Sequence, residues 1–346
     1  MGNSVMKPRS FALCIAFVVL EYGATAHHGA VAIYNREAPV TIRGTITRYE
    51  WRNPHVYLYV EENTGSAEPP IWEIEGPPPA ILRRFGWTDD TVGVGDMVTV
   101  DGFSGRAVDR RIALMQSLTK ADGTVLNTQL LRMMTSLPRV DAAVALTQAT
   151  SIGGTWTTSL DMNLIGRFQL PTPPQVALTE KGQLALANSG EAADAPAVNC
   201  VPMSAPMLML TPDIKSIEVR PNVVMIRGEF DASERTVYLD VDSHDGAAES
   251  VQGHSIGRWD GGTLIIDTTQ FAPRRTGGGL PSGSRKHLVE RLALTNDRSH
   301  LTYEFNLEDP EYLASPLSGA IQWAFRPDLD YQRLPCDLDN ARRFLQ

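Results

Sequence analysis

The sequence has little cysteine, no run of lysine or arginine, and no apolar stretch long enough to cross a bilayer. Three cysteines occur in 346 residues, and 40 acidic side chains outnumber 31 basic ones, which gives a formal net charge of -9. An acidic surface repels a phosphate backbone, so the composition disfavours nucleic acids as partners. Neither a complete catalytic motif nor an internal repeat is present, which argues against a solenoid and leaves function to be inferred from smaller groups of residues.

Residues 1–26 are typical of an export signal. Basic residues precede an apolar run over residues 11–20, and residues 24–26 have the small side chains of a cleavage site. A membrane-spanning helix needs about 20 apolar residues, so this shorter run predicts a removed signal and not a retained anchor. We therefore expect a periplasmic protein without a stable membrane anchor, whose mature chain begins at His27.

Cleavage leaves two cysteines, Cys200 and Cys336, because Cys14 lies inside the apolar run. Cysteines exported to an oxidising compartment usually pair. We therefore predict a disulfide between Cys200 and Cys336, with two buried thiols as the alternative. Cys14 follows the bulky Leu13, which disfavours lipid attachment at that position.

Apolar and polar residues alternate along residues 27–126 in the manner of β-strands. Five strands with a short helix after the third is the order of an OB-fold barrel, and we predict an OB-like barrel here. The expected strands cover residues 41–49, 56–60, 71–75, 95–102 and 112–119, and the expected helix covers residues 77–85.

A linker over residues 127–150, apolar enough to include a short helix, leads to a second domain over residues 151–346. We predict an antiparallel β barrel or sandwich there, so that the whole protein belongs to the all-β class with minor helix. Its expected strands cover residues 223–230, 235–240, 262–267, 287–294 and 301–307, with one helix at 179–187. The opening Gly-Thr-Trp at residues 154–156 resembles the start of lipocalin-like barrels.

An N-terminal histidine predicts a metal site. The free amine and imidazole of His27 can close a chelate ring on one ion, and His28 and His55 offer further imidazoles. Divalent copper favours a planar set of such nitrogens, so copper is the expected cofactor. The alternatives are cleavage at another position and an ordinary surface role for His55.

The segment Gly253-His254-Ser255-Ile256-Gly257 fits the G-x-S-x-G pattern of a hydrolase nucleophile. That pattern works on a sharp turn from a strand into a helix, whereas residues 258–267 are typical of a β-hairpin. A serine hydrolase therefore requires a triad on another fold, for which Asp267 and His287 are the available partners.

The same region predicts a ligand-binding site, because donors lie beside an aromatic residue on neighbouring strands. The candidate residues are His254, Ser255, Arg258, Trp259, Asp267, His287, Glu290 and Arg291. We expect a buried ion pair between Arg258 and either Asp267 or Glu290, since charged side chains that face inward need partners. Purely structural pairing is the alternative.

Both domains resemble exported families of unknown function from Gram-negative bacteria. The N-terminal resemblance covers residues 26–126 and rests on Ala26-His27-His28, Trp51-Arg52-Asn53-Pro54-His55 and Gly95-Asp96-Met97-Val98. The C-terminal resemblance covers residues 153–346 and rests on Cys200-Val201-Pro202, Gly253-His254-Ser255-Ile256-Gly257-Arg258-Trp259, His287-Leu288-Val289-Glu290-Arg291 and Cys336. Members of the second family follow their last cysteine with His-Glu, where this chain has Asp337-Leu338. The resemblance implies the architecture and no activity.

Together these features predict a periplasmic binding protein whose partner is a metal ion or a small molecule. Two other classes stay open at this point. One is an exported enzyme, either a copper-dependent oxidase-like enzyme or a serine hydrolase acting on a small hydrophobic substrate. The other is an assembly factor of the cell envelope.

Overall fold

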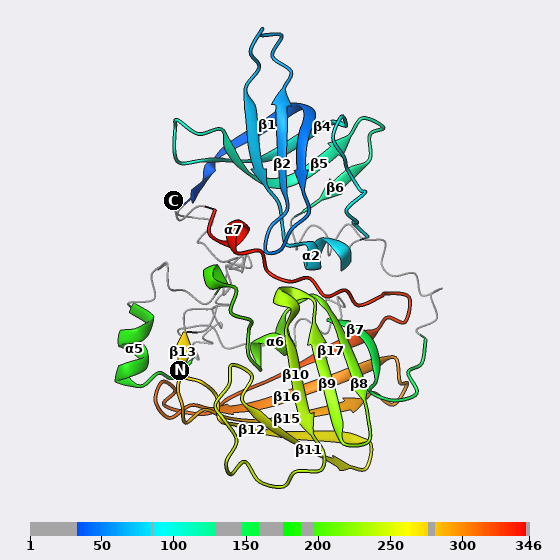
Figure 1. The fold of residues 1–346 in the computed structure, drawn as a ribbon, viewed down its shortest axis with the longest axis vertical. Coiled ribbons are helices and arrows are strands. Elements are labelled where there is room, and N and C mark those ends of the chain that lie inside the picture. Colours follow the sequence, from blue (N-terminus) through cyan, green and yellow to red (C-terminus); the bar gives the residue numbers. More distant parts are fainter. Residues whose placement is uncertain are drawn as a thin grey trace, which may run out of the picture.

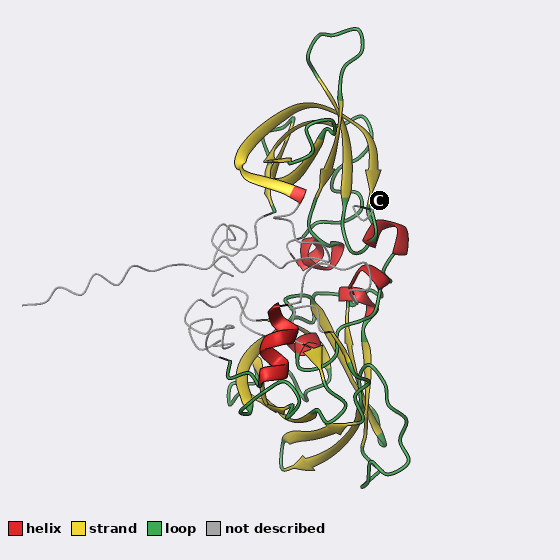
Figure 2. Cartoon of the chain, turned by 90° about the vertical axis from the view of Figure 1, so that its left-hand side faces the viewer, coloured by secondary structure: helices red, strands yellow, loops and turns green. Residues whose placement is uncertain are grey.

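The computed structural model describes residues 33–84, 86–128, 147–158, 176–187, 197–275 and 281–343. These residues form two strand-rich bodies, one above the other in Figure 1, and the predicted all-β class is confirmed. The side view in Figure 2 shows short helices gathered where the two bodies meet. The predicted signal peptide, His27, His28 and most of the predicted linker lie outside the described residues.

The N-terminal body is a six-stranded sheet in the order β3-β2-β1-β4-β5-β6, and an extra parallel pairing of β3 with β5 curls it around a core. Its elements are β1 (Tyr34–Glu50), β2 (Tyr57–Glu62), β3 (Ile71–Glu75), α2 (Pro79–Arg84), β4 (Met97–Gly105), β5 (Ile112–Lys120) and β6 (Val125–Asn127). The five predicted strands and the helix after the third are confirmed. The three-residue β6 was not predicted, because it is too short to show an alternating pattern.

Strand β1 is long because it pairs with β4 and with β2 along its length. Ile42 and Ile46 point into the core, and Gly44 lies between them. A Cβ atom at Gly44 would lie 1.9 Å from the carbonyl oxygen of Glu61, so only glycine allows β2 to approach β1 this closely.

The C-terminal body is a closed barrel in the order β10-β11-β12-β15-β16-β17-β7-β8-β9, which decides between the predicted barrel and sandwich. Its strands are β7 (Gly154–Thr158), β8 (Ile214–Val219), β9 (Val223–Gly228), β10 (Glu234–Tyr238), β11 (His254–Asp260), β12 (Thr263–Thr269), β15 (His287–Leu294), β16 (His300–Glu308) and β17 (Leu317–Phe325). Every neighbouring pair is antiparallel except β10 and β11, which are parallel. The predicted antiparallel order is wrong at that junction, because residues 239–253 cross over instead of forming a hairpin.

Aromatic and aliphatic side chains fill the barrel. Trp156, Tyr303 and Trp323 are fully buried, and the rings of Tyr303 and Trp323 stack with their centroids 6.0 Å apart. The predicted helix is α5 (Glu180–Ala187), and the Thr179 hydroxyl accepts a hydrogen bond from the Gly182 amide as its N-cap. The remaining short elements are η1 (Ala197–Asn199), α6 (Met207–Leu210), η2 (Phe230–Ala232), β13 (Arg274–Arg275), β14 (Pro281–Ser282) and α7 (Leu338–Ala341).

The two bodies are joined through α2 and through the end of the chain. Arg83 forms an ion pair with the buried carboxylate of Glu229, and Arg84 donates hydrogen bonds to Thr158 at the end of β7. After β17 the chain returns to the N-terminal body, and we name residues 331–343 the C-terminal strap. In Figure 1 the strap lies between the two bodies, with α7 against the lower end of the N-terminal sheet.

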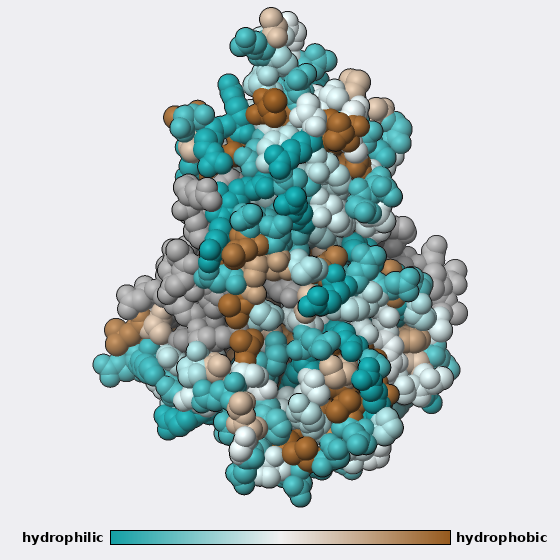
Figure 3. All heavy atoms as spheres, in the orientation of Figure 1, coloured by the Kyte–Doolittle hydropathy of each residue, from teal (hydrophilic) through white to brown (hydrophobic). Residues whose placement is uncertain are grey.

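The predicted disulfide between Cys200 and Cys336 is present, with the two Cα atoms 5.5 Å apart. It links the strap to the segment between η1 and α6, 136 positions earlier in the chain. Within the described ranges, no helix is both long and apolar enough to span a membrane. The face shown in Figure 3 is mainly polar, with apolar side chains in scattered patches.

Candidate functional site

His55 lies at the junction between the N-terminal sheet and the C-terminal strap. Its side chain is 3% exposed, so the alternative that it is an ordinary surface histidine is wrong. The ring atom Nδ1 lies 3.1 Å from the carbonyl oxygen of Gly76 and 3.2 Å from Oε1 of Glu75. A carbonyl oxygen can only accept, so Nδ1 carries the proton and Nε2 keeps a lone pair. Metal-binding imidazoles commonly use this arrangement, with one nitrogen fixed by a carbonyl or carboxylate and the other directed at the ion.

Glu75 connects His55 to the beginning of β1. Its Oε2 accepts hydrogen bonds from the hydroxyls of Tyr34, at 2.8 Å, and Tyr57, at 3.3 Å. Burial and the charge of Glu75 raise the pKa of both tyrosines, so both hydroxyls remain donors. Burial also lowers the pKa of His55 to about 4, which keeps the imidazole neutral at pH 7. A neutral imidazole is the form that coordinates a metal.

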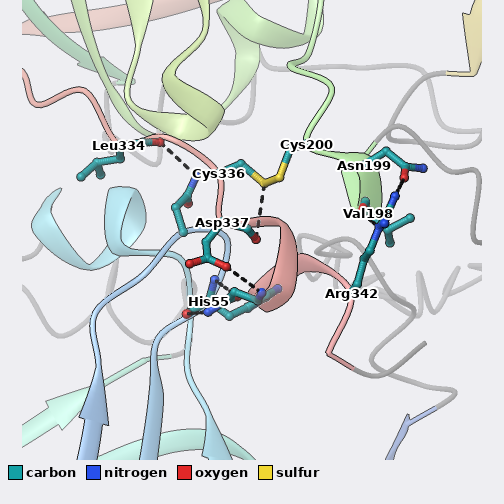
Figure 4. The surroundings of a disulfide bond; sticks show 10 residues. His55, Val198, Asn199, Cys200, Leu334, Cys336, Asp337 and Arg342 are labelled. Atoms are coloured by element: carbon teal, nitrogen blue, oxygen red, sulfur yellow. Dashed lines mark hydrogen bonds between the residues drawn. A yellow bond between two sulfur atoms is a disulfide. The ribbon is translucent and has the colours of Figure 1, made fainter. Parts of the chain in front are cut away.

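The C-terminal strap holds the His55 backbone from the other side (Figure 4). The amide of His55 donates to Oδ1 of Asn340 at 3.2 Å, and Nδ2 of Asn340 donates to the His55 carbonyl at 2.9 Å. Asn53 bonds to the strap as well, because its carbonyl accepts from the Asp337 amide at 2.7 Å and its Nδ2 donates to the Leu334 carbonyl at 3.2 Å. The predicted family motif at residues 51–55 is therefore the docking surface for the strap.

Arg343 extends this contact across the sheet. Its guanidinium lies 3.9 Å from the centroid of the Tyr57 ring and forms ion pairs with Glu50, at 2.6 Å, and Glu73, at 3.0 Å. Sequence reasoning missed the strap, because contacts between residues almost 300 positions apart leave no local pattern. His27 and His28 lie outside the described residues, and within the described ranges no group of three or more His, Cys, Asp or Glu side chains is arranged to hold a metal ion.

A second candidate site lies on the outer face of the barrel, and we name it the histidine cluster. It consists of His244, His254, Asp267 and His287. Nδ1 of His244 lies 2.9 Å from Nδ1 of His254, and Nε2 of His244 lies 3.2 Å from Oδ1 of Asp267. Nε2 of His287 lies 3.1 Å from the same oxygen. Three of the predicted ligand-binding residues therefore meet here, and His244 joins them from the loop between β10 and β11.

Two other predicted residues, Ser255 and Glu290, face the interior of the barrel. We name their surroundings the inner polar cluster, which consists of Arg235, Ser255, Thr268, Glu290 and Tyr303. Arg235 donates to Ser255 at 3.0 Å, to Thr268 at 2.7 Å and to Glu290 at 2.9 Å. The hydroxyl of Tyr303 donates to Glu290 at 2.8 Å. All five residues are buried, and their hydrogen bonds to one another support the alternative of structural pairing.

The predicted ion pair of Arg258 with Asp267 or Glu290 is wrong. Glu290 pairs with Arg235 inside the barrel, and Asp267 pairs with histidines outside it. Arg258 is exposed, because alternate residues of a strand point to opposite faces of the sheet. Trp259 and Arg291 are exposed as well.

Ser255 does not form a catalytic triad with Asp267 and His287. The barrel wall separates them, since Ser255 points inward and the other two residues lie on the outer face. Residues 258–267 form the expected hairpin of β11 and β12 and not the turn into a helix that the hydrolase motif requires.

A family of unknown function (DUF6152) matches residues 16–112. The matched range includes Tyr34, His55 and Glu75 and extends to the first residue of β5. No curated protein matches the chain.

Proposed function

We propose that this protein is a periplasmic copper-binding protein in which the mature N-terminus and His55 hold the ion. The observation that carries the proposal is the double contact of Glu75, whose carboxylate receives the Tyr34 hydroxyl on one oxygen and lies against His55 Nδ1 with the other. The beginning of the described chain is thereby fixed beside the imidazole.

The chain length from His27 supports the same proposal. Tyr34 follows His27 by seven residues, which reach at most ~24 Å when fully extended. A mature N-terminus at His27 is therefore within range of His55. The amine and imidazole of His27 would supply two nitrogen ligands and Nε2 of His55 a third, which is a donor set that divalent copper favours.

The surroundings of His55 match the needs of a metal ligand. Gly76 and Glu75 fix the tautomer, Asn340 fixes the backbone, and burial keeps the ring neutral. Ligands that are held in place in this way lose little freedom when the ion binds. An N-terminal amine has a pKa of about 8, so its deprotonation by copper at neutral pH costs little.

A serine hydrolase has less support, because Ser255 donates or accepts its hydrogen bonds inside the barrel, away from Asp267 and His287. An oxidase-like copper enzyme would use the same nitrogen ligands, and a copper-loaded sample tested for oxygen consumption separates it from a binding protein.

Copper stoichiometry on exported, correctly processed protein tests the proposal. Mass spectrometry first verifies that the chain begins at His27. We expect about one equivalent of Cu(II) on the wild type, and loss of uptake in His55→Gln. His287→Gln is the matched control, which should retain the ion. Full uptake by His55→Gln would overturn the proposal.

A further inference from the structure

The junction between β10 and β11 is the weakest in the described barrel wall. These strands pair at only two positions, Val237 with Ser255 and Tyr238 with Ile256. By comparison, β15 pairs with β16 at eight positions and β12 pairs with β15 at six. Because each pairing contributes backbone hydrogen bonds, the β10–β11 junction has the least backbone support against opening.

Side chains reinforce this junction from the inside. Arg235 on β10 donates a hydrogen bond across the junction to Ser255 on β11. The same guanidinium also donates to Thr268 on β12 and to Glu290 on β15. The inner polar cluster therefore bridges the gap that the backbone leaves.

The histidine cluster reinforces the same junction from the outside. Residues 239–253 connect β10 to β11, and His244 ties the middle of this loop to the outer wall through His254 on β11 and Asp267 on β12. The ring of Tyr238 on β10 stacks on His254 with centroids 5.2 Å apart. Elsewhere the loop is fixed by its ends, where the Leu239 amide donates to Asn222 and the Ser250 amide donates to Gln270.

The hydrogen bond between His244 and His254 can form only while at least one of the two Nδ1 atoms lacks a proton. Nε2 of His244 donates to Asp267, so Nδ1 of a neutral His244 accepts from Nδ1 of His254. One added proton turns His244 into a donor at both nitrogens, and His254 then accepts. A second proton makes both Nδ1 atoms donors, so the hydrogen bond is lost and two positive rings repel at close range.

Asp267 from β12 contacts His244, and His287 from β15 contacts the same carboxylate. The loop itself carries Asp240, Asp242 and Asp245. The carboxylate of Asp267 lies 3.2 Å from Nε2 of His244 and would pair with a positively charged ring. Burial and the neighbouring His244 lower the pKa of His254, so the second proton binds only below the usual histidine range.

We propose that His244 and His254 form an acid-opened latch on the β10–β11 junction. At neutral pH the latch holds the loop over residues 239–253 against the barrel wall. When acid protonates both rings, the pair separates, the loop lifts, and β10 loses its short pairing with β11 and becomes accessible to solvent. This opens the barrel from the side, next to the inner polar cluster. The inference does not depend on copper binding.

Hydrogen exchange tests the latch on the intact, disulfide-bonded protein at pH 7.5, 6.5, 5.5 and 4.5, with rates corrected for intrinsic exchange. In the wild type we expect peptides from 234–238 and 239–253 to lose at least tenfold protection between pH 6.5 and 4.5, while β15 and β16 stay protected. In His254→Gln the amide can donate or accept, so protection should persist at pH 4.5. His287→Gln is the matched control and should open like the wild type.

Three results would overturn the latch. The wild type could keep its protection at pH 4.5, His254→Gln could open in parallel with the wild type, or EDTA could open the loop at pH 7.5. The last result would assign the cluster to a metal ion and not to protons. Retained protection in β15 and β16 shows in each variant that the barrel is folded.

Discussion

Asn340 and His55 lie 285 positions apart in the chain and hold each other through two hydrogen bonds, at 3.2 and 2.9 Å. One side-chain amide thereby satisfies both the backbone N–H and the backbone carbonyl of His55. The position of the candidate metal ligand in the N-terminal body therefore depends on the end of the C-terminal body.

Asn340→Ala should destabilise the protein and weaken copper binding. The substitution removes two hydrogen bonds to the buried backbone of His55, which costs about 2 to 4 kcal/mol. Urea unfolding should show this loss as a lower midpoint with an unchanged slope. Asn306→Ala is the control, because Asn306 contacts the exposed Ser318, and it should change stability by less than about 0.5 kcal/mol.

The disulfide should contribute strongly to the position of the strap. Cys200 and Cys336 close a loop of 136 positions, and constraining a loop of this length stabilises the folded state by about 5 kcal/mol in the chain-entropy description. The double variant Cys200→Ser, Cys336→Ser should show this loss in urea unfolding. It should also increase hydrogen exchange in residues 331–343. An unchanged strap would show that Arg343 and Asn340 hold it without the disulfide.

Glu290→Gln should strongly lower the free energy of unfolding. Arg235 and Glu290 are both fully buried, and removing one charge leaves the other uncompensated, which costs about 3 to 5 kcal/mol. The double variant Arg235→Met, Glu290→Leu removes both charges and should recover most of that loss. Arg291→Gln on the same strand is the exposed control and should be close to neutral. A double variant as unstable as Glu290→Gln would contradict this account of the inner polar cluster.

The copper-free protein should lose stability as the pH falls from about 6.5 to 4. Burial lowers the pKa of His55 to about 4, whereas in the unfolded chain it is about 6.5. Between these values only the unfolded state binds the proton, so the free energy of unfolding falls by about 3 kcal/mol across this window. Urea unfolding in EDTA at pH 7, 5.5 and 4 measures this slope. His55→Gln should remove that part of the slope, and an identical slope in both proteins would contradict the assignment.

The sequence predicted those parts of the fold that depend on local pattern. The strands at residues 71–75 and 287–294 match their predicted ranges, because alternating apolar residues mark one buried face. Strand β8 was missed because Lys215 occupies a buried position, where it pairs with Asp213. Strand β17 was missed because most of its residues are only half-buried and show no clear alternation.

The candidate sites were predictable to the extent that they lie on predicted strands. His254, Asp267 and His287 occupy outward positions on neighbouring strands, and they do meet. His244 lies in a loop, where no periodicity indicates its direction. Arg235 lies at the start of a predicted strand, but its inward orientation depends on the register that the closed barrel imposes.

Electron paramagnetic resonance of the Cu(II)-loaded mature protein tests the central claim most directly. Pulsed measurements count the imidazoles that coordinate the ion through their remote nitrogens. We predict two coordinated imidazoles, from His27 and His55, in the wild type, and one or none in His55→Gln. An identical spectrum from both proteins would contradict a copper site built on His55.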